Sequence, residues 1–216
     1  MKDNEPILIF GCGGHAKVVW DILNIRGYKN FIFVDKDPTT ESQFLGHSRL
    51  GLNDALQISK RGIVAIGDNY TRKIIVTNTI KICPDFIFIS AIHPTATIGL
   101  HTTIESGTVV MANTAINCFC KIGSHTIINT GSTVDHECNI DDFSSLAPGC
   151  TLGGSVHIEQ LSAVGLGANI IHNVTVGENS VVGAGSTVIN DINSNQLAFG
   201  TPCVEVRTRR IGEKYL

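Results

Sequence analysis

An aliphatic residue occupies every sixth position of the chain from Ile92 to Val188 without interruption. A period of six matches neither an α-helix, with about 3.6 residues per turn, nor a simple alternating strand. It is the repeat of a hexapeptide β-helix, in which each six-residue unit forms one short side of a coil. The ladder positions are Ile92, Ile98, Ile104, Val110, Ile116, Ile122, Ile128, Val134, Ile140, Leu146, Leu152, Ile158, Val164, Ile170, Val176, Val182 and Val188.

Small side chains fill the position two residues before each ladder residue, as the inside of a narrow prism requires. From Ala96 onward this position holds only Ala, Thr, Cys, Ser or Val. Cys120, Cys138 and Cys150 belong to this column, so we predict that they pack in the core. The other cysteines are scattered and no CxxC pair occurs, so neither a disulfide framework nor a zinc knuckle is indicated. Glycine is common directly after a ladder residue, which we interpret as the corner of the coil.

The first 90 residues follow another pattern. Apolar runs at 6–10, 31–34, 63–66 and 86–89 predict strands, and helical spacing follows the first and third of them, the second helix running from about 70 to 82. Strands that alternate with helices predict an α/β fold with a parallel sheet.

A glycine-rich turn, Gly11-Cys12-Gly13-Gly14-His15-Ala16, follows the first predicted strand, and Asp35 ends the second. This fits the G-x-G-x-x-A dinucleotide fingerprint, whose glycines let the backbone approach a pyrophosphate at a helix N-terminus. Asp35 can accept a ribose hydroxyl. Only about four strands fit here, half of a full dinucleotide fold, so a nucleotide-linked sugar suits the turn better than NAD does. A turn that merely connects strand and helix is the alternative.

Composition excludes several classes of function. The net charge of −3 gives neither a nucleic-acid footprint nor a patch for anionic membranes. The longest apolar runs are far too short to cross a bilayer, and the N-terminus lacks the apolar run of a signal peptide. We therefore expect a cytoplasmic protein, and no metal requirement is visible.

The glycine turn, followed by an unbroken hexapeptide ladder that contains Asp135-His136-Glu137-Cys138, resembles the sugar O-/N-acetyltransferases of bacterial glycan synthesis. These include the bacillosamine N-acetyltransferases and the sialic-acid-pathway acetyltransferases, and the resemblance covers nearly the whole chain. It implies a left-handed parallel β-helix, a homotrimer and acetyl-CoA as co-substrate. The implied acceptor is the 4-amino group of a 4-amino-4,6-dideoxy sugar that is linked to a nucleotide. The nucleotide that the resemblance favours is UDP. The resemblance divides the chain into two domains. Residues 1–90 form a Rossmann-like domain that binds the nucleotide-sugar, and residues 91–216 form the β-helix acetyltransferase domain with a C-terminal tail.

The resemblance also assigns residues. It implies His136 as catalytic base, Glu137 as its supporting carboxylate and Asn129 as an active-site amide. Sugar-nucleotide contacts fall on Gly13, Gly14, His15, Asp35, Lys36, Gly67, Asp68 and Asn69. Acetyl-CoA contacts fall on Ser145, Gly154, Gly165, Leu166 and Ala184. The chain departs from the family at Ser145, where many members have a second histidine, and at Lys36, where an acidic residue is common.

A histidine suits acetyl transfer to an amine because it can accept a proton at neutral pH. We expect direct attack of the amine on bound acetyl-CoA, with no acyl-enzyme and with the Gly154 amide as candidate oxyanion donor. An ordinary exposed histidine is the alternative for His136. The basic tail, residues 206–210, has two interpretations: it binds the phosphates of CoA, or its charges are simply exposed to solvent.

Other functions remain open at this point. A carbonic-anhydrase-type hexapeptide enzyme needs two zinc-binding histidines five residues apart, and no pair here has that spacing. A non-catalytic sugar-nucleotide sensor, an O-acetyltransferase acting on a sialic-acid-like sugar and an N-acetyltransferase acting on a GDP-linked amino sugar are the alternatives. Because the ladder admits no insertion, no loop can cover a substrate, so we predict active sites in grooves between three packed prisms.

Overall fold

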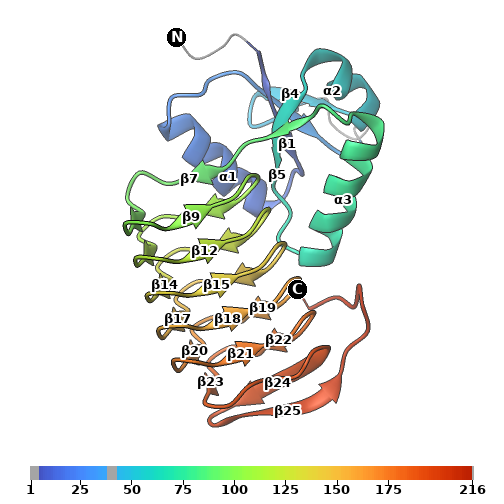
Figure 1. Cartoon of the computed structure of the whole chain (residues 1–216). Coiled ribbons are helices and arrows are strands. Elements are labelled where there is room, and N and C mark those ends of the chain that lie inside the picture. Colours follow the sequence, from blue (N-terminus) through green and yellow to red (C-terminus); the bar gives the residue numbers. More distant parts are fainter. Residues whose placement is uncertain (1–4, 38–42, 216) are drawn as a thin grey trace.

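The computed structural model describes residues 5–37 and 43–215 and places a small α/β unit on the N-terminal end of a three-sided coil (Figure 1). The α/β unit holds one sheet in the order β3-β4-β2-β1-β5-β6. All neighbouring strands are parallel except β3, which is antiparallel to β4. The elements are β1 (Ile7–Phe10), α1 (Gly14–Ile25), β2 (Phe31–Val34), β3 (Gln43–Phe44), β4 (His47–Leu50), α2 (Leu52–Ile58), β5 (Arg61–Val64), α3 (Asn69–Ile82) and β6 (Ile87–Phe88).

The predicted parallel sheet is confirmed, with two differences in detail. The third predicted strand begins two residues earlier, as β5, and the fourth is only two residues long, as β6. The segment that forms β3, β4 and α2 has no clear apolar period, and the sequence analysis missed it. Among the described residues, no helix is long and apolar enough to cross a membrane.

The coil is a left-handed parallel β-helix of two-residue strands, and the second residue of each strand from β7 to β23 is a ladder residue. Ile128 pairs with Leu146, one full turn of three hexads later. We call the three sheets the first, second and third faces. The first face holds β7 (Ala91–Ile92), β10 (Val109–Val110), β13 (Ile127–Ile128), β16 (Ser145–Leu146), β19 (Ala163–Val164), β22 (Val181–Val182), β24 (Gln196–Gly200) and β25 (Cys203–Thr208). The second face holds β8 (Thr97–Ile98), β11 (Ala115–Ile116), β14 (Thr133–Val134), β17 (Thr151–Leu152), β20 (Asn169–Ile170) and β23 (Thr187–Val188). The third face holds β9 (Thr103–Ile104), β12 (Lys121–Ile122), β15 (Asn139–Ile140), β18 (His157–Ile158) and β21 (Thr175–Val176).

The ladder residues form the core of the prism, together with the small column. From Val110 onward every ladder residue is buried. Cys120, Cys138 and Cys150 are at most 1% exposed, which confirms their prediction as packing residues. All seven cysteines are free thiols.

The corners of the coil differ from the sequence interpretation. Left-handed backbone occurs three residues after a ladder residue, as at Phe119, Glu137 and Gly149, rather than directly after it. The glycines that directly follow the ladder are needed because the next turn passes too close. A Cβ on Gly153 would lie 2.7 Å from the backbone nitrogen of His172. Glycine is therefore required at these positions because a side chain would collide with the next turn, and not because the backbone has a positive φ.

Several interactions join the α/β unit to the coil, among them an apolar cluster and a buried arginine. In the cluster, Val19 and Ile22 of α1 pack with Val109 and Ile127 of the first face. The arginine is Arg72 of α3, which is 1% exposed. Its guanidinium donates hydrogen bonds to oxygens of three segments: Ile66 O (2.9 Å), Gly67 O (2.9 Å), Asn69 Oδ1 (2.7 Å), His125 O (2.7 Å), Phe143 O (3.0 Å) and Ser144 O (3.2 Å).

Burial lowers the pKa of Arg72 to about 10, so the guanidinium remains charged at neutral pH. A charge without water is tolerated only when its hydrogen bonds are filled, and the carbonyls of His125, Phe143 and Ser144 fill them from the coil side. Arg72 thereby fixes the start of α3 against the coil.

Leu146→Ala should lower the free energy of unfolding by about 3 kcal/mol, because it leaves a cavity at a fully buried ladder position. Leu100→Ala is the matched control, since Leu100 is 79% exposed and its loss should cost less than about 0.5 kcal/mol. Chemical denaturation measures both. Equal effects would contradict the assignment of the ladder as the core.

Arg72→Met should also destabilise the fold by about 3 kcal/mol, since it leaves the buried carbonyls that face Arg72 without a donor. Arg26→Met, at an exposed arginine of the same unit, is the control and should change little. Hydrogen exchange at the amides of residues 66–72 should accelerate in Arg72→Met only. An unchanged unfolding curve for Arg72→Met would refute the role of this residue.

Candidate active site

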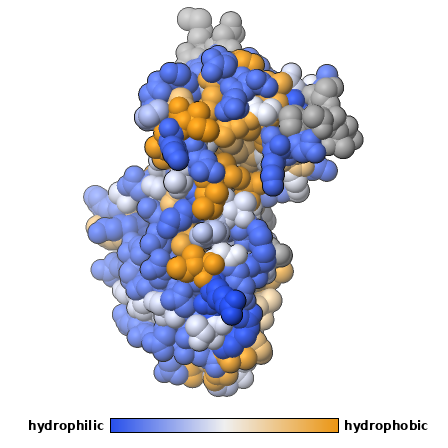
Figure 2. Space-filling model, turned by 90° about the vertical axis from the view of Figure 1, so that its right-hand side faces the viewer, coloured by the Kyte–Doolittle hydropathy of each residue, from blue (hydrophilic) through white to orange (hydrophobic). Residues whose placement is uncertain are grey.

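A pocket of about 420 Å³ lies where the α/β unit meets the first face of the coil. The first turn of α1 contributes His15, the loop after β5 contributes Gly67, and the C-terminal segment contributes Tyr215. The floor is apolar and is formed by Ile127, Ala147, Pro148, Ala163, Val164, Gly165, Leu166, Val181, Val182, Gly183 and Ala184. Figure 2 shows apolar side chains that continue from the α/β unit across the waist of the molecule onto the coil.

Four polar side chains also line this pocket. His15, Asn129, Ser145 and Tyr215 line it together with Gly67. The Nε2 atom of His15 is buried and has no hydrogen-bond partner among the described residues. Burial, and then the positive charge of Arg72, lower the pKa of His15 to about 4, so its ring is neutral at pH 7. The pocket thus joins an apolar channel to neutral hydrogen-bonding groups.

His136 lies elsewhere, at the corner between the second and third faces. Its Nδ1 is 3.0 Å from Glu137 Oε2, and the side chain is 53% exposed. Its backbone N–H donates to Asp135 Oδ1 at 2.8 Å, which fixes the corner. A Cβ on Gly154 would lie 2.6 Å from His136 Cε1, so the ring lies directly against a residue without a side chain.

The Glu137 contact determines the chemistry that His136 offers. When Nδ1 carries a hydrogen and donates it to the carboxylate, Nε2 keeps a lone pair. No described residue contacts Nε2 by a hydrogen bond, so it is open to a ligand. The arrangement is that of a general base with an orienting carboxylate.

The structure therefore divides the predicted residues into two groups. Ser145, Gly165, Leu166 and Ala184 lie with Asn129 in the pocket on the first face. The other group is at the distant corner, where Gly154 adjoins His136 and Glu137. A complete face of the coil, the second, separates the groups within one chain.

The glycine turn opens to solvent at the start of α1. Gly13 and Gly14 are exposed, and a Cβ built on either would meet no atom within 4 Å. Gly11, in contrast, has a φ of 118°, and a Cβ there would lie 2.8 Å from Ile66 Cδ1. Gly11 is thus required by the fold, whereas Gly13 and Gly14 leave room for a ligand next to the free N–H groups of α1.

Asp35 lies at the end of β2 and is held by a neighbour that the sequence analysis did not identify. Arg49 of β4 contacts its Oδ2 through Nη2 at 2.7 Å and through Nε at 3.0 Å. Burial alone would raise the pKa of Asp35, but hydrogen bonds from the Asp37 amide, Cys12 and Arg49 outweigh burial and lower it. The neighbouring Lys36 is exposed. Asp35 is therefore an ionised acceptor beside a cation.

Asp68 and Asn69 are engaged within the protein. Asp68 caps α3, because its Oδ1 accepts the Thr71 N–H at 2.8 Å. Asn69 is 1% exposed, and its Nδ2 donates to Leu161 O at 3.1 Å and Ser162 O at 3.0 Å. Both side chains hold the loop that carries Gly67 into the pocket.

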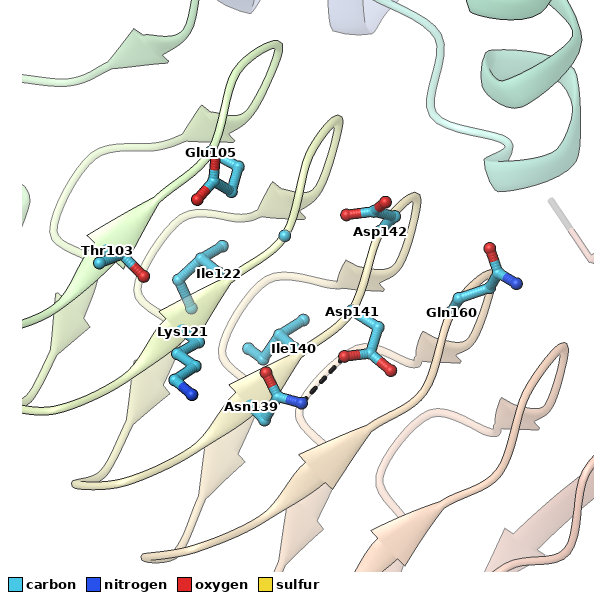
Figure 3. A pocket seen from close by; sticks show the side chains of 10 residues that line it. Thr103, Glu105, Lys121, Ile122, Asn139, Ile140, Asp141, Asp142 and Gln160 are labelled. Atoms are coloured by element: carbon cyan, nitrogen blue, oxygen red, sulfur yellow. Dashed lines mark hydrogen bonds between the residues drawn. The ribbon is translucent and has the colours of Figure 1, made fainter.

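A second hollow, of about 400 Å³, lies on the third face (Figure 3). Within it, Asn139 Nδ2 donates to Asp141 Oδ1 at 3.0 Å, and the adjacent His157 Nε2 lies 2.9 Å from Asp141 Oδ2. In the described parts of the chain, no group of three or more His, Cys, Asp or Glu side chains is placed to hold a metal ion. We assign no chemistry to this hollow.

Three residues around the pocket and the turn escaped the sequence analysis: Arg49, Arg72 and Tyr215. Each contacts at least one segment that is distant in sequence, and none belongs to a recognisable motif. The sequence shows that the tail is basic, but no local sequence pattern indicates that it runs back to the α/β unit.

Comparison with known proteins agrees with this architecture. Residues 6–79 match the family model of the PglD N-terminal domain. PerB from Caulobacter crescentus, solved in complex with CoA and GDP-perosamine, is 35% identical, with a TM-score of 0.88 over 95% of this chain and 99% of that one. The acetyltransferase domain of PglB from Neisseria gonorrhoeae, solved in complex with acetyl coenzyme A, is 30% identical, with a TM-score of 0.87 over 94% and 100%.

WeeI from Acinetobacter baumannii, 23% identical with a TM-score of 0.85 over 93% of this chain and 99% of that one, shares the fold. No curated protein matches the chain. A GDP-perosamine N-acetyltransferase from Caulobacter crescentus, also solved in complex with CoA and GDP-perosamine, is 34% identical to this chain. Identity at this level over 98% of that enzyme shows the family. The chain therefore belongs to the hexapeptide-repeat sugar N-acetyltransferases.

Proposed function

We propose that the protein transfers the acetyl group of acetyl-CoA to the amino group of a nucleotide-linked sugar, by preference a 4-amino-4,6-dideoxy sugar. The observation that carries this proposal is the His136–Glu137 pair at 3.0 Å with an open Nε2, in a chain of this family. The Caulobacter relative, which shares most of its length, is a GDP-perosamine N-acetyltransferase, which favours an amine over a hydroxyl as acceptor.

The reaction needs one proton acceptor. The amine nitrogen attacks the thioester carbonyl, and His136 Nε2 removes a proton from the nitrogen as the C–N bond forms. The tetrahedral intermediate then collapses, the C–S bond breaks, and the CoA thiolate leaves and receives the proton from the His136 imidazolium. Glu137 stabilises the imidazolium that exists between these steps. The Gly154 amide, next to the ring, is our candidate donor to the oxyanion.

Acetyl-CoA is proposed to lie along the apolar floor of the pocket, over Gly165, Leu166 and Ala184. The small residues Gly165 and Ala184 leave space for a narrow chain such as the pantetheine arm. The structures of PerB and the PglB domain hold CoA and acetyl-CoA respectively, which supports this co-substrate.

The nucleotide-sugar is assigned to residues 1–90 and acetyl transfer to residues 91–216. The open backbone at Gly13 and Gly14 suits a pyrophosphate, and the ionised Asp35 suits a ribose hydroxyl. UDP is the nucleotide that the sequence resemblance favours. GDP is the second candidate, because PerB is solved with GDP-perosamine.

The division of the proposed site supports a homotrimer. One chain presents the pocket on its first face and the base at a corner beyond its second face, so it cannot bring both to one substrate. Three-fold packing of prisms can place the His136 corner of one copy against the pocket of the next. Each trimer then has three sites, and every site needs two chains.

His136→Ala should lower kcat by a factor of about 100 to 10,000 through loss of the base. Binding of the nucleotide-sugar, followed by calorimetry, should be unchanged. His172→Ala, in the same corner column two turns on, is the control and should keep full activity. The assay offers UDP-4-amino sugars, GDP-4-amino sugars and sialic acids with acetyl-CoA. Full turnover by His136→Ala would eliminate this base, and acetylation of sialic acids alone would refute the proposed acceptor.

Sedimentation should give a particle of three times the chain mass of 23.1 kDa. Ala184→Trp, which blocks the pocket, and His136→Ala should each be inactive alone. When the two variants are co-expressed, one site in each mixed trimer, about a quarter of all sites after random assembly, pairs an intact pocket with an intact base, so activity should return. A fully active monomer, or no recovery in mixed trimers, would contradict sites shared between chains.

A further inference from the structure

A side-chain contact between two turns of the coil holds the corner that carries His136. Asn117 Nδ2 donates to Asp135 Oδ1 at 2.7 Å, and the backbone N–H of His136 donates to the same oxygen at 2.8 Å. The hydrogen bond from Asn117, and then that from the His136 amide, lower the pKa of Asp135, so the carboxylate is ionised at neutral pH. Hydrogen bonds to an ionised acceptor are stronger than neutral ones. One carboxylate oxygen thus joins the backbone of His136 to the preceding turn.

The backbone of neighbouring turns bonds to the rest of this corner. The Ser155 N–H donates to His136 O at 2.9 Å, and the Glu137 N–H donates to Cys118 O at 3.1 Å. Among the three residues of the corner, 135–137, only His136 has an N–H that donates to a side chain. The position of the His136 backbone therefore depends on the Asp135 carboxylate as well as on the ladder of the coil.

The coil itself does not require a polar pair at this place. The residue that directly follows a ladder residue of the second face is, in chain order, Gly99, Asn117, Asp135, Gly153, Ile171 or Ile189. Four of these six have no side chain that can form a hydrogen bond. A Cβ at Gly99 or Gly153 would lie 2.5 or 2.7 Å from backbone atoms of the next turn, so glycine suits the packing here. The two polar residues are exceptions in this column, and they occur at the turn of His136 and at the turn before it.

A second histidine of the same corner column shows what is particular to His136. His172 lies two turns further on, between Ile171 and Asn173. Neither neighbour has a carboxylate, and Ile171 has no atom that could accept the His172 N–H. His136, in contrast, stands between two carboxylates, one bonded to its backbone and one to its ring. The additional contacts are thus confined to the histidine that we propose as the base.

We propose that Asn117 and Asp135 are positioning residues, which hold the backbone of His136 so that its Nε2 reaches the acceptor amine. The His136 side chain is 53% exposed and lies against Gly154, a residue without a side chain, so the direction of the ring depends on the backbone that carries it. A small misplacement of a reacting group slows a reaction strongly. The inference rests on the proposed function, because it takes His136 as the base.

Two substitutions of Asp135 separate its position from its charge. Asp135→Ala removes the acceptor oxygen, whereas Asp135→Asn keeps an oxygen in the same place and removes the charge. Asp135→Ala should lower kcat about tenfold with unchanged KM values for both substrates, and Asp135→Asn should keep at least about half of the wild-type kcat. Steady-state kinetics of amino-sugar acetylation measure both variants.

A double-mutant cycle tests whether the two residues act as one unit. Asn117→Ala should lower kcat about threefold in the wild-type background, because Asp135 loses one of its two donors. In the Asp135→Ala background the same substitution should cost nothing further, since both residues act through one oxygen.

Asp142→Ala is the matched control. Asp142 is exposed, and its Oδ1 accepts the Ser124 N–H of the preceding turn at 2.7 Å, at a corner away from His136. Asp142→Ala should keep the wild-type kcat, while its midpoint of chemical denaturation should be similar to that of Asp135→Ala. A loss of kcat in Asp135→Ala alone then reports positioning rather than stability.

Four results would overturn the inference: full kcat in Asp135→Ala, equal kcat in Asp135→Asn and Asp135→Ala, additive losses in the double variant, or an equal loss in Asp142→Ala. Each of them leaves His136 as the base, provided that His136→Ala is inactive. Full turnover by His136→Ala would instead contradict the proposed function itself.

Discussion

One buried cation determines how the two halves of this protein meet. Arg72, which is 1% exposed, donates to carbonyls of the loop before α3 and to carbonyls of two successive turns of the coil. Because a buried guanidinium is tolerated only with its hydrogen bonds filled, the loop and the coil have little freedom to separate. The pocket exists at this junction, so its shape, the position of Gly67 and the environment of His15 all depend on Arg72.

The ladder imposes the second constraint. A coil whose neighbouring turns are only about 4.8 Å apart and whose corners pass close to one another has no space for a loop that covers a substrate. Chemistry must then occur at corners and on faces, where single exposed side chains such as His136 stand on a rigid backbone. A flat face gains a concave site only from another body, which here is the α/β unit, the tail and, as we propose, a neighbouring copy.

Much of this arrangement could be predicted from the sequence because it is local and periodic. Two inward columns predicted the coil and the burial of Cys120, Cys138 and Cys150. The alternation of apolar runs with helices predicted the parallel sheet, and the Asp135–Cys138 motif drew attention to His136 before its contact with Glu137 was known. The segment with β3, β4 and α2 was missed because short elements at a sheet edge lack a clear apolar period. The role of the corner glycines was misjudged, since a close approach by the next turn leaves no sign within one hexad.

The sequence by itself determined the prism, the sheet and the residue types available for catalysis, because each follows from spacing along the chain. Only the tertiary structure decided which of these residues meet. It separated His136 from Asn129 and Ser145 by a whole face of the coil and gave Asp68 and Asn69 to the support of α3. It also brought Tyr215 into the pocket that His15 lines. Contacts between segments far apart in sequence depend on the path of the whole backbone, and no local pattern encodes that path.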